Sequence, residues 1–91
     1  MPIIHSSVTL SNTTPTQVVT PQTLSQEVHL HNLTKSSNEY IYIGNETVST
    51  SNSIHLDPGE SITLTIGPSD SLWAVSDPTG LGLGVLTIKQ D

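Results

Sequence analysis

The sequence predicts an all-β fold, a small antiparallel β-sandwich or jelly-roll-like barrel of about eight short strands. Short runs of alternating apolar and polar residues recur along the chain, and turn residues separate them at intervals of about 8–12 residues. No stretch of useful length carries the roughly 3.6-residue periodicity of an amphipathic helix. The 91 residues are therefore expected to form a single β-sandwich domain spanning 1–91.

The N-terminal region leaves two interpretations open. Ser7–Leu10 alternates and predicts the first strand. Residues 1–8 contain the apolar pair Ile3 and Ile4, so they form either an N-terminal arm that adds as a strand to another surface or simply the start of the first strand. Gln17–Thr20 is a second short strand, and Pro21 after it favours a position at a sheet edge.

Two alternating runs in the middle of the chain are expected to pair as antiparallel neighbours. The first, Glu27–Leu33, places Val28 and Leu30 on one side and its charged and imidazole side chains on the other. The second, Tyr40–Ile43, places its isoleucines on one side and its tyrosines on the other, and it stops at Gly44-Asn45.

The C-terminal half continues this pattern. A brief strand at Ser53–Leu56 leads into Asp57-Pro58-Gly59-Glu60, which suits a type II turn because proline presets φ at the second position and glycine supplies a positive φ at the third. The remaining strands are expected at Ser61–Ile66, Leu72–Ser76 and Val85–Lys89, with the glycine-rich run 80–84 as a flexible approach to the last one.

Composition limits how the domain is stabilised. The apolar fraction is 33%, and there are only three aromatic residues, one Trp and two Tyr, so the core is thin. The absence of cysteine excludes disulfides and thiolate zinc sites. Association with copies of itself, or with a larger surface, is the stabilising device that remains for so small a domain.

Charge excludes two classes of partner. Lys35 and Lys89 are the only basic residues beside eight acidic ones, and the net charge is −6. Phosphate binding requires several Lys or Arg, so neither nucleic acid nor an anionic membrane is an expected partner. No apolar run approaches the roughly 18–20 residues of a membrane span. The N-terminus is not expected to be a secretory signal, since it lacks a basic segment followed by a long apolar one.

The search for reactive groups predicts no enzyme and no cofactor. His29, His31 and His55 are weak candidates for a metal site, but the polar face of a strand or a subunit contact explains them as well. No serine lies in a nucleophile elbow, and the carboxylates fall in turns and loops. Asn12, Asn32 and Asn45 each begin an Asn-x-Thr glycosylation pattern, which a chain this rich in Thr produces by chance. Tyr40, Tyr42 and Trp73 could form a sugar-binding platform, although packing is their expected use.

The ordered motifs from residue 27 onward resemble the small β-sandwich decoration (cement, or head-stabilising) proteins of tailed-bacteriophage capsids. The motifs are Val28–Asn32, Tyr40–Gly44, Val48–Asn52, Leu56–Ser61, Leu72–Val75 and Val85–Ile88. Related modules occur in phage head fibres and tail proteins, and no catalytic residue is implied. The run at 80–84 is longer and more glycine-rich than the family's pattern, so the resemblance does not determine the geometry of the last hairpin.

The resemblance implies a non-enzymatic virion protein that decorates and stabilises the capsid exterior by bridging capsomers. It would be made in the host cytoplasm and would bind the major capsid protein as a homo-oligomer, with a trimer favoured. The alternative is a tail or fibre module that recognises host surface glycans. The residues expected to make such contacts are Ile3, Ile4, Tyr40, Tyr42 and Trp73.

Overall fold

The structure, a computed structural model, describes residues 3–51 and 54–89 and contains eight strands within them. The strands are β1 (Ile3–Thr9), β2 (Thr16–Val19), β3 (Gln26–Asn32), β4 (Tyr40–Gly44), β5 (His55–Leu56), β6 (Ser61–Ile66), β7 (Leu72–Asp77) and β8 (Gly82–Lys89). The prediction of an all-β fold of about eight short strands is confirmed. None of the described residues belongs to a helix long and apolar enough to cross a membrane.

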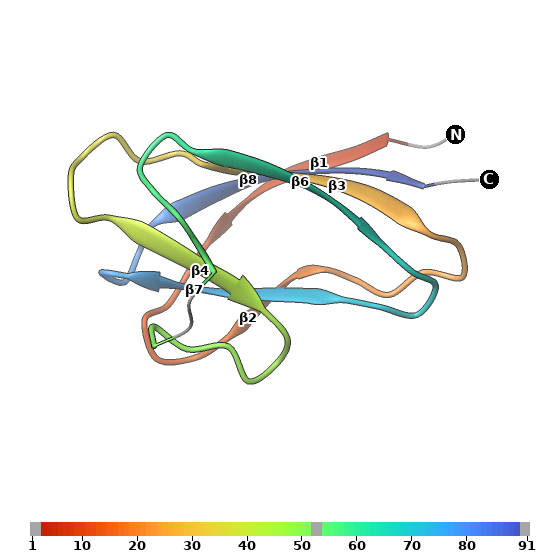
Figure 1. The fold of residues 1–91 in the computed structure, drawn as a ribbon, viewed down its shortest axis with the longest axis horizontal. Helices are drawn as coiled ribbons and strands as arrows, with labels where there is room; N and C mark the ends of the chain where they lie inside the picture. The colour runs from red at the N-terminus through yellow and green to blue at the C-terminus, as the bar shows by residue number, and fades with distance from the viewer. Residues whose placement is uncertain (1–2, 52–53, 90–91) are drawn as a thin grey trace.

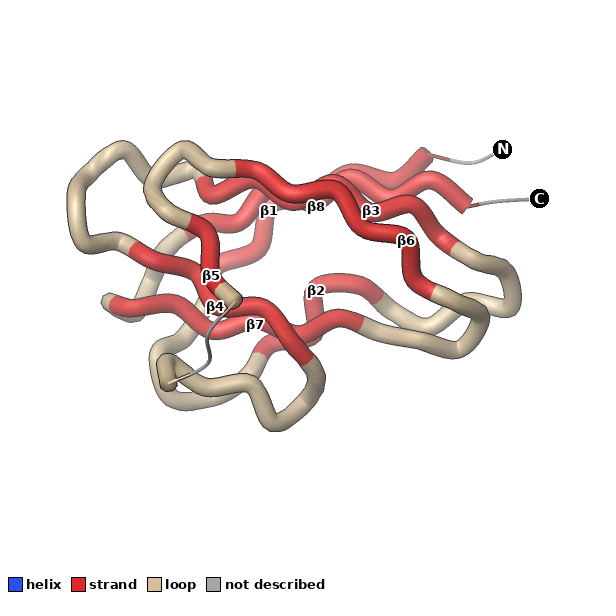
Figure 2. Tube along the Cα trace, viewed as in Figure 1, coloured by secondary structure: helices blue, strands red, loops and turns tan. Residues whose placement is uncertain are grey.

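The strands form two four-stranded antiparallel sheets that pack face to face (Figures 1 and 2). One, called sheet A, has the order β1-β8-β3-β6, and the other, sheet B, has the order β2-β7-β4-β5. Every connection except the one between β4 and β5 carries the chain from one sheet to the other. This alternation between two sheets is the topology of a jelly roll, in agreement with the predicted fold class.

The predicted pairing of Glu27–Leu33 with Tyr40–Ile43 is wrong. The first segment corresponds to β3, which pairs with β6 and β8, whereas the second corresponds to β4, which pairs with β5 and β7. Both strands turn one apolar row inward, so they face each other across the core instead of lying side by side. The seven-residue connection 33–39 is longer than a tight hairpin loop, and it crosses between the sheets.

The core lies between the sheets and contains the inward rows of six strands. Its buried members are Leu10, Val19, Val28, Leu30, Ile41, Ile43, Leu56, Ala74, Leu81, Leu83 and Val85. The alternation predicted for the two central strands is confirmed, since Val28, Leu30, Ile41 and Ile43 are buried while the tyrosines point outward and are half-buried. No aromatic ring belongs to this cluster, so aliphatic packing supplies the interior.

The turn before β6 has the predicted geometry. Gly59 has a φ of 76°, and the Glu60 N–H donates to the Asp57 carbonyl over 2.9 Å. The Glu60 carboxylate also accepts from the Asp57 N–H at 2.9 Å. A positive φ at the third residue with a first-to-fourth hydrogen bond is what a type II turn requires. The preceding strand is shorter than predicted, β5 spanning only His55–Leu56, and Ser53 lies outside the described residues.

The prediction that residues 80–84 form a flexible approach to the last strand is wrong. Gly82 and Gly84 are already part of β8, and Leu81 and Leu83 between them are buried in the core. Both glycines lie beneath the Leu33 side chain, and a Cβ at Gly84 would stand 3.4 Å from Leu33 Cδ2. The glycines therefore leave room for a leucine that crosses the outside of the sheet.

Candidate functional site

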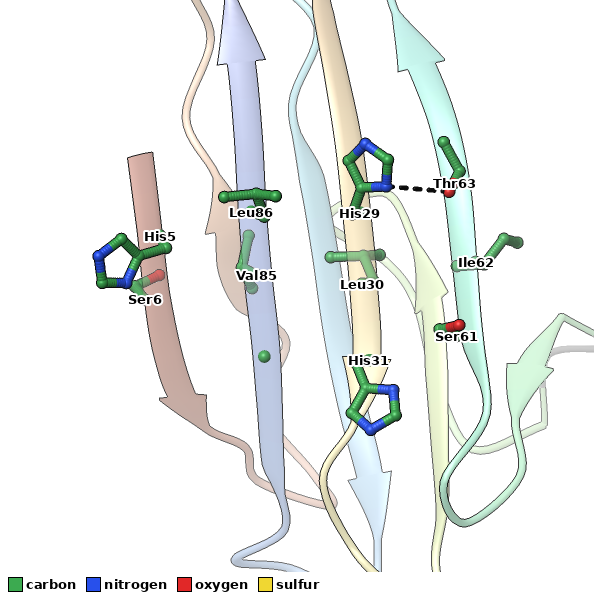
Figure 3. A pocket seen from close by; sticks show the side chains of 11 residues that line it. His5, Ser6, His29, Leu30, His31, Ser61, Ile62, Thr63, Val85 and Leu86 are labelled. Atoms are coloured by element: carbon green, nitrogen blue, oxygen red, sulfur yellow. Dashed lines mark hydrogen bonds between the residues drawn. The ribbon is translucent and has the colours of Figure 1, made fainter. Parts of the chain in front are cut away.

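The outer face of sheet A is a broad, weakly charged surface. Because β1, β8, β3 and β6 are in register, His5, Leu86, His29 and Thr63 form one row across it. Figure 3 shows these side chains on four neighbouring strands. The next row contains Ser7, Gly84, His31 and Ser61. Four segments far apart in the sequence thus meet on one face.

A shallow hollow of about 350 Å³ lies on this face. Its rim includes His5, His29 and His31, and Gly84 lines it where a side chain would otherwise rise from β8. Apolar groups surround the same area, since Leu86 and Ile88 are half-buried along β8 while Ile3 and Leu33 are 62% and 46% exposed. The surface combines imidazole and aliphatic groups.

His29 is held in place by two neighbours. Its Nε2 lies 2.8 Å from Glu27 Oε1 on the same strand, and its Nδ1 lies 3.1 Å from Thr63 Oγ1 on β6. Figure 3 shows the second contact and also shows the His5 ring on the side of β1 away from His29. Because both nitrogens of His29 already have partners, the ring is fixed as part of the surface.

The weak metal candidates do not converge. His29 and His31 lie on sheet A, whereas His55 lies on β5 in sheet B. Among the described residues, no three His, Asp or Glu side chains form a group that could hold a metal ion. The interpretation of these histidines as polar strand residues therefore fits their positions.

Tyr40 and Tyr42 share the outer face of sheet B with His55. The His55 ring lies near both, with centroid separations of 5.4 Å from Tyr40 and 5.6 Å from Tyr42. His55 Nε2 also lies 3.1 Å from Asp57 Oδ1. The three rings form an aromatic cluster, and the sequence alone missed the role of His55 in it because that role depends on the pairing of β4 with β5.

Trp73 lies on the same outer face as the tyrosines, one step away along the sheet. It stands opposite Gly44 on β4 and Gln17 on β2, while Val75, two residues further along β7, stands opposite Tyr42. Its indole N–H donates to Ser71 Oγ over 3.2 Å. The structure thus brings all three aromatic interaction candidates to one face of the molecule.

Ile3 and Ile4 belong to β1, the edge strand of sheet A. All of residues 3–8 pair with β8, from Ile3 opposite Ile88 to Val8 opposite Leu83, which is the first-strand interpretation of this segment. Met1 and Pro2, also in the range considered for an arm, lie outside the described residues. Both isoleucines remain exposed, Ile3 on the outer face and Ile4, at 53%, on the inner side.

Asn32 begins an Asn-x-Thr pattern that the sequence explains by chance alone, and the structure gives it a structural role. Asn32 is fully buried, and its Nδ2 donates to the carbonyls of Glu39 at 3.0 Å and Leu56 at 3.1 Å. Its Oδ1 accepts from the N–H and the hydroxyl of Thr34. Since the amide is buried and its donors are used, Asn32 ties β3 to β5 in the opposite sheet and cannot accept a glycan in this fold.

No protein-family model and no curated protein matches the chain. Among solved structures, the chain is similar to one of Bacillus endospore appendages, which are described as "a novel family of disulfide-linked pili". The TM-score is 0.54 and the identity 8%, and the match covers 99% of this chain and 87% of that chain. At this identity the similarity concerns the fold alone.

Proposed function

We propose that this chain is a non-enzymatic structural protein of a bacteriophage particle, which binds the outer surface of the capsid and stabilises it by bridging capsomers. The motif order from Val28 to Ile88 supports this assignment through its resemblance to decoration proteins. The partner is the major capsid protein and the location is the virion exterior. Trimeric assembly remains a prediction from the same resemblance.

The observation that carries the proposal is the outer face of sheet A. In a chain of net charge −6, the outward strand positions of this sheet contain a single carboxylate, Glu27, beside imidazoles, hydroxyls and exposed aliphatic groups. The other described acidic residues lie in loops or on sheet B, namely Glu39, Glu46, Asp57, Glu60, Asp70 and Asp77. A nearly uncharged face with exposed aliphatic groups, opposite a remainder that carries most of the carboxylates, suits a protein that lies flat on a larger shell.

The test is binding to purified expanded capsids that lack decoration protein. The wild-type chain is expected to bind at a saturating, symmetric stoichiometry. Leu86→Glu places a charge in the middle of this nearly uncharged face and is expected to weaken binding at least about tenfold. Thr50→Glu adds the same charge in an exposed loop and should bind like the wild type. Absence of wild-type binding, or equal binding by both variants, would refute the proposal.

A second candidate function is glycan recognition by a tail or fibre module. The observation that favours it is the presence of Tyr40, Tyr42 and Trp73 on one outer face, with His55 between the tyrosines. Aromatic faces of this kind can stack on sugar rings. A glycan array with Trp73→Ala as the comparison decides the matter, because this function requires a signal that the substitution removes.

The pilus subunits named above are disulfide-linked, and this chain has no cysteine. Any assembly that it forms must therefore do without disulfides between copies of this chain. Among the described residues, its surface offers exposed apolar groups and unpaired backbone groups for non-covalent contacts. The β1 edge of sheet A presents both.

A further inference from the structure

We propose that β1 is a self-association edge, at which two copies of this chain pair β1 with β1 around a two-fold axis through Ser6. The two A sheets would then form one continuous eight-stranded antiparallel sheet. The proposal concerns the free protein and the backbone edge of β1, so it can fail without affecting the capsid-binding proposal, although β1 also contributes side chains to the outer face of sheet A.

The first argument comes from the backbone. Just after β1, the Leu10 N–H donates to the Leu81 carbonyl, and the Leu10 carbonyl accepts from the Gly80 N–H. Both partners lie in the segment that leads into β8, so the backbone groups of Leu10 face β8. Because backbone groups alternate direction along a strand, the even-numbered residues of β1 also face β8. The N–H and C=O groups of Ile3, His5, Ser7 and Thr9 consequently point to the free edge, where no described strand pairs with them.

The second argument is that β1 lacks the features that usually protect a sheet edge. Natural edges are short, bulged, charged or interrupted by proline. β2 has four residues, a register shift between Gln17 and Val19, and prolines on both sides, while β5 has only two residues. By contrast, β1 has seven residues in unbroken register and contains no proline, lysine or carboxylate.

The remaining edge, β6, differs in how its apolar row is covered. Ile62 and Ile66 on its inner side pack against the core, and its outward residues are Ser and Thr. In β1 the inward Ile4 is 53% exposed, and it borders a hollow of about 200 Å³ with Val18, Val19 and Val85. The inner side of β1 therefore has apolar surface that its own chain does not bury.

The sequence of β1 suits antiparallel pairing with β1 of a second copy. With the two-fold axis at Ser6, Ile3 lies opposite Thr9 and His5 opposite Ser7, which are the residues with free backbone groups. The inward residues then match as well, since Ile4 lies opposite Val8 of the second copy and Ser6 lies opposite itself. This register uses all seven residues, faces apolar side chains toward each other and opposes no like charges. These features identify a second copy of this chain as the occupant of the edge.

A single cysteine tests the register directly, because the chain has none of its own. Ser6 in the proposed pair is at a non-hydrogen-bonded position, where Cα atoms stand about 4.5 Å apart and a disulfide can close. Ser6→Cys is therefore expected to form a covalent dimer on mild oxidation. Ser61→Cys, on the other edge of sheet A, is the matched control and should remain largely unlinked.

A proline tests the hydrogen bonds without a change in the fold. The Ser7 N–H points away from β8, so Ser7→Pro removes an edge donor but no bond within sheet A. Since the residue occurs twice in the pair, the substitution removes two intermolecular bonds, and the dimer should weaken at least about tenfold. Ser7→Thr keeps the N–H and should dimerise like the wild type.

Sedimentation velocity of the wild-type chain at up to roughly 1 mM, where even a weak complex is populated, provides the readout. The expected species has twice the 9.7 kDa of one chain. A protein that stays monomeric, a Ser6→Cys variant that does not link, or unlimited growth into filaments would each overturn the proposal. Filaments in particular would mean that β1 pairs with β6 of the next copy.

Discussion

At the scale of single residues, Asn32 joins the two sheets through its side chain. It lies in β3, and its side chain makes four hydrogen bonds, two of them to carbonyls of the chain that leads into and forms sheet B. A second Asn-x-Thr segment provides a natural comparison. Asn45 accepts the same local bonds from Thr47, at 2.9 Å and 2.7 Å, but it is exposed, and within residues 3–51 and 54–89 its amide nitrogen makes no bond to the other sheet.

We predict that Asn32→Ala lowers the free energy of unfolding by about 2–4 kcal/mol, because it leaves buried carbonyls without donors. Asn45→Ala should cost only about 0.5–1 kcal/mol, since water can replace the lost bonds at an exposed turn. Urea denaturation of both variants measures the difference, which isolates the bonds between the sheets. Equal losses would mean that the Asn32 amide contributes nothing beyond its local turn.

At the scale of elements, the glycines of this chain have two distinct uses. Gly59 adopts a positive φ of 76° in the turn before β6, where a side chain would be strained. Gly82 has no such conformation and lies within β8, where a Cβ would meet Leu33 Cδ1 at an ordinary 3.5 Å. Backbone geometry requires the first glycine, whereas the second only leaves space for a neighbour.

We predict that alanine has opposite effects at these two positions. Gly59→Ala should destabilise the protein by about 1 kcal/mol through strain at a positive φ. Gly82→Ala should stabilise it by up to about 0.5 kcal/mol, because alanine loses less conformational freedom in a strand. Thermal or urea unfolding of the two variants side by side is sufficient, and a change of the same sign in both would contradict this assignment of roles.

At the scale of the whole molecule, the negative charge is distributed unevenly over the surface. The net charge is −6, yet β1 contains no carboxylate or lysine, and Glu27 is the single carboxylate at the outward strand positions of sheet A. Two copies that approach through β1 therefore repel each other through their overall charge, while the contact itself is made by uncharged groups.

We predict that salt strengthens the proposed dimer. Raising the ionic strength from about 0.05 M to 0.5 M shortens the screening length from above 10 Å to a few Å, which reduces the repulsion between the two chains. Backbone hydrogen bonds and the Ile4–Val8 contact are affected far less. Sedimentation at the two salt concentrations measures the shift, and an association that weakened with salt would instead indicate ion pairs at the interface.

Much of the local structure follows from the sequence. Alternation with a period of two determines which side chains of Glu27–Leu33 and Tyr40–Ile43 turn inward, and Pro58-Gly59 determines a turn with a positive φ. The same pattern predicts an all-β sandwich, and the composition excludes disulfides and predicts that nucleic acid is not a partner. These conclusions depend only on neighbours in the chain and on the kinds of residue present.

The tertiary structure alone decided which strands lie side by side. An apolar row specifies a face but not the neighbour on either edge, so β3 and β4, both apolar on one side, could equally have paired or faced each other across the core. Because β3 pairs with β8 and β6, and β4 with β5, positions 5, 86, 29 and 63 form one row on sheet A, and the His55 ring lies close to two tyrosines on sheet B. The candidate surfaces depend on contacts between distant segments, and the packing of two sheets around one core creates them.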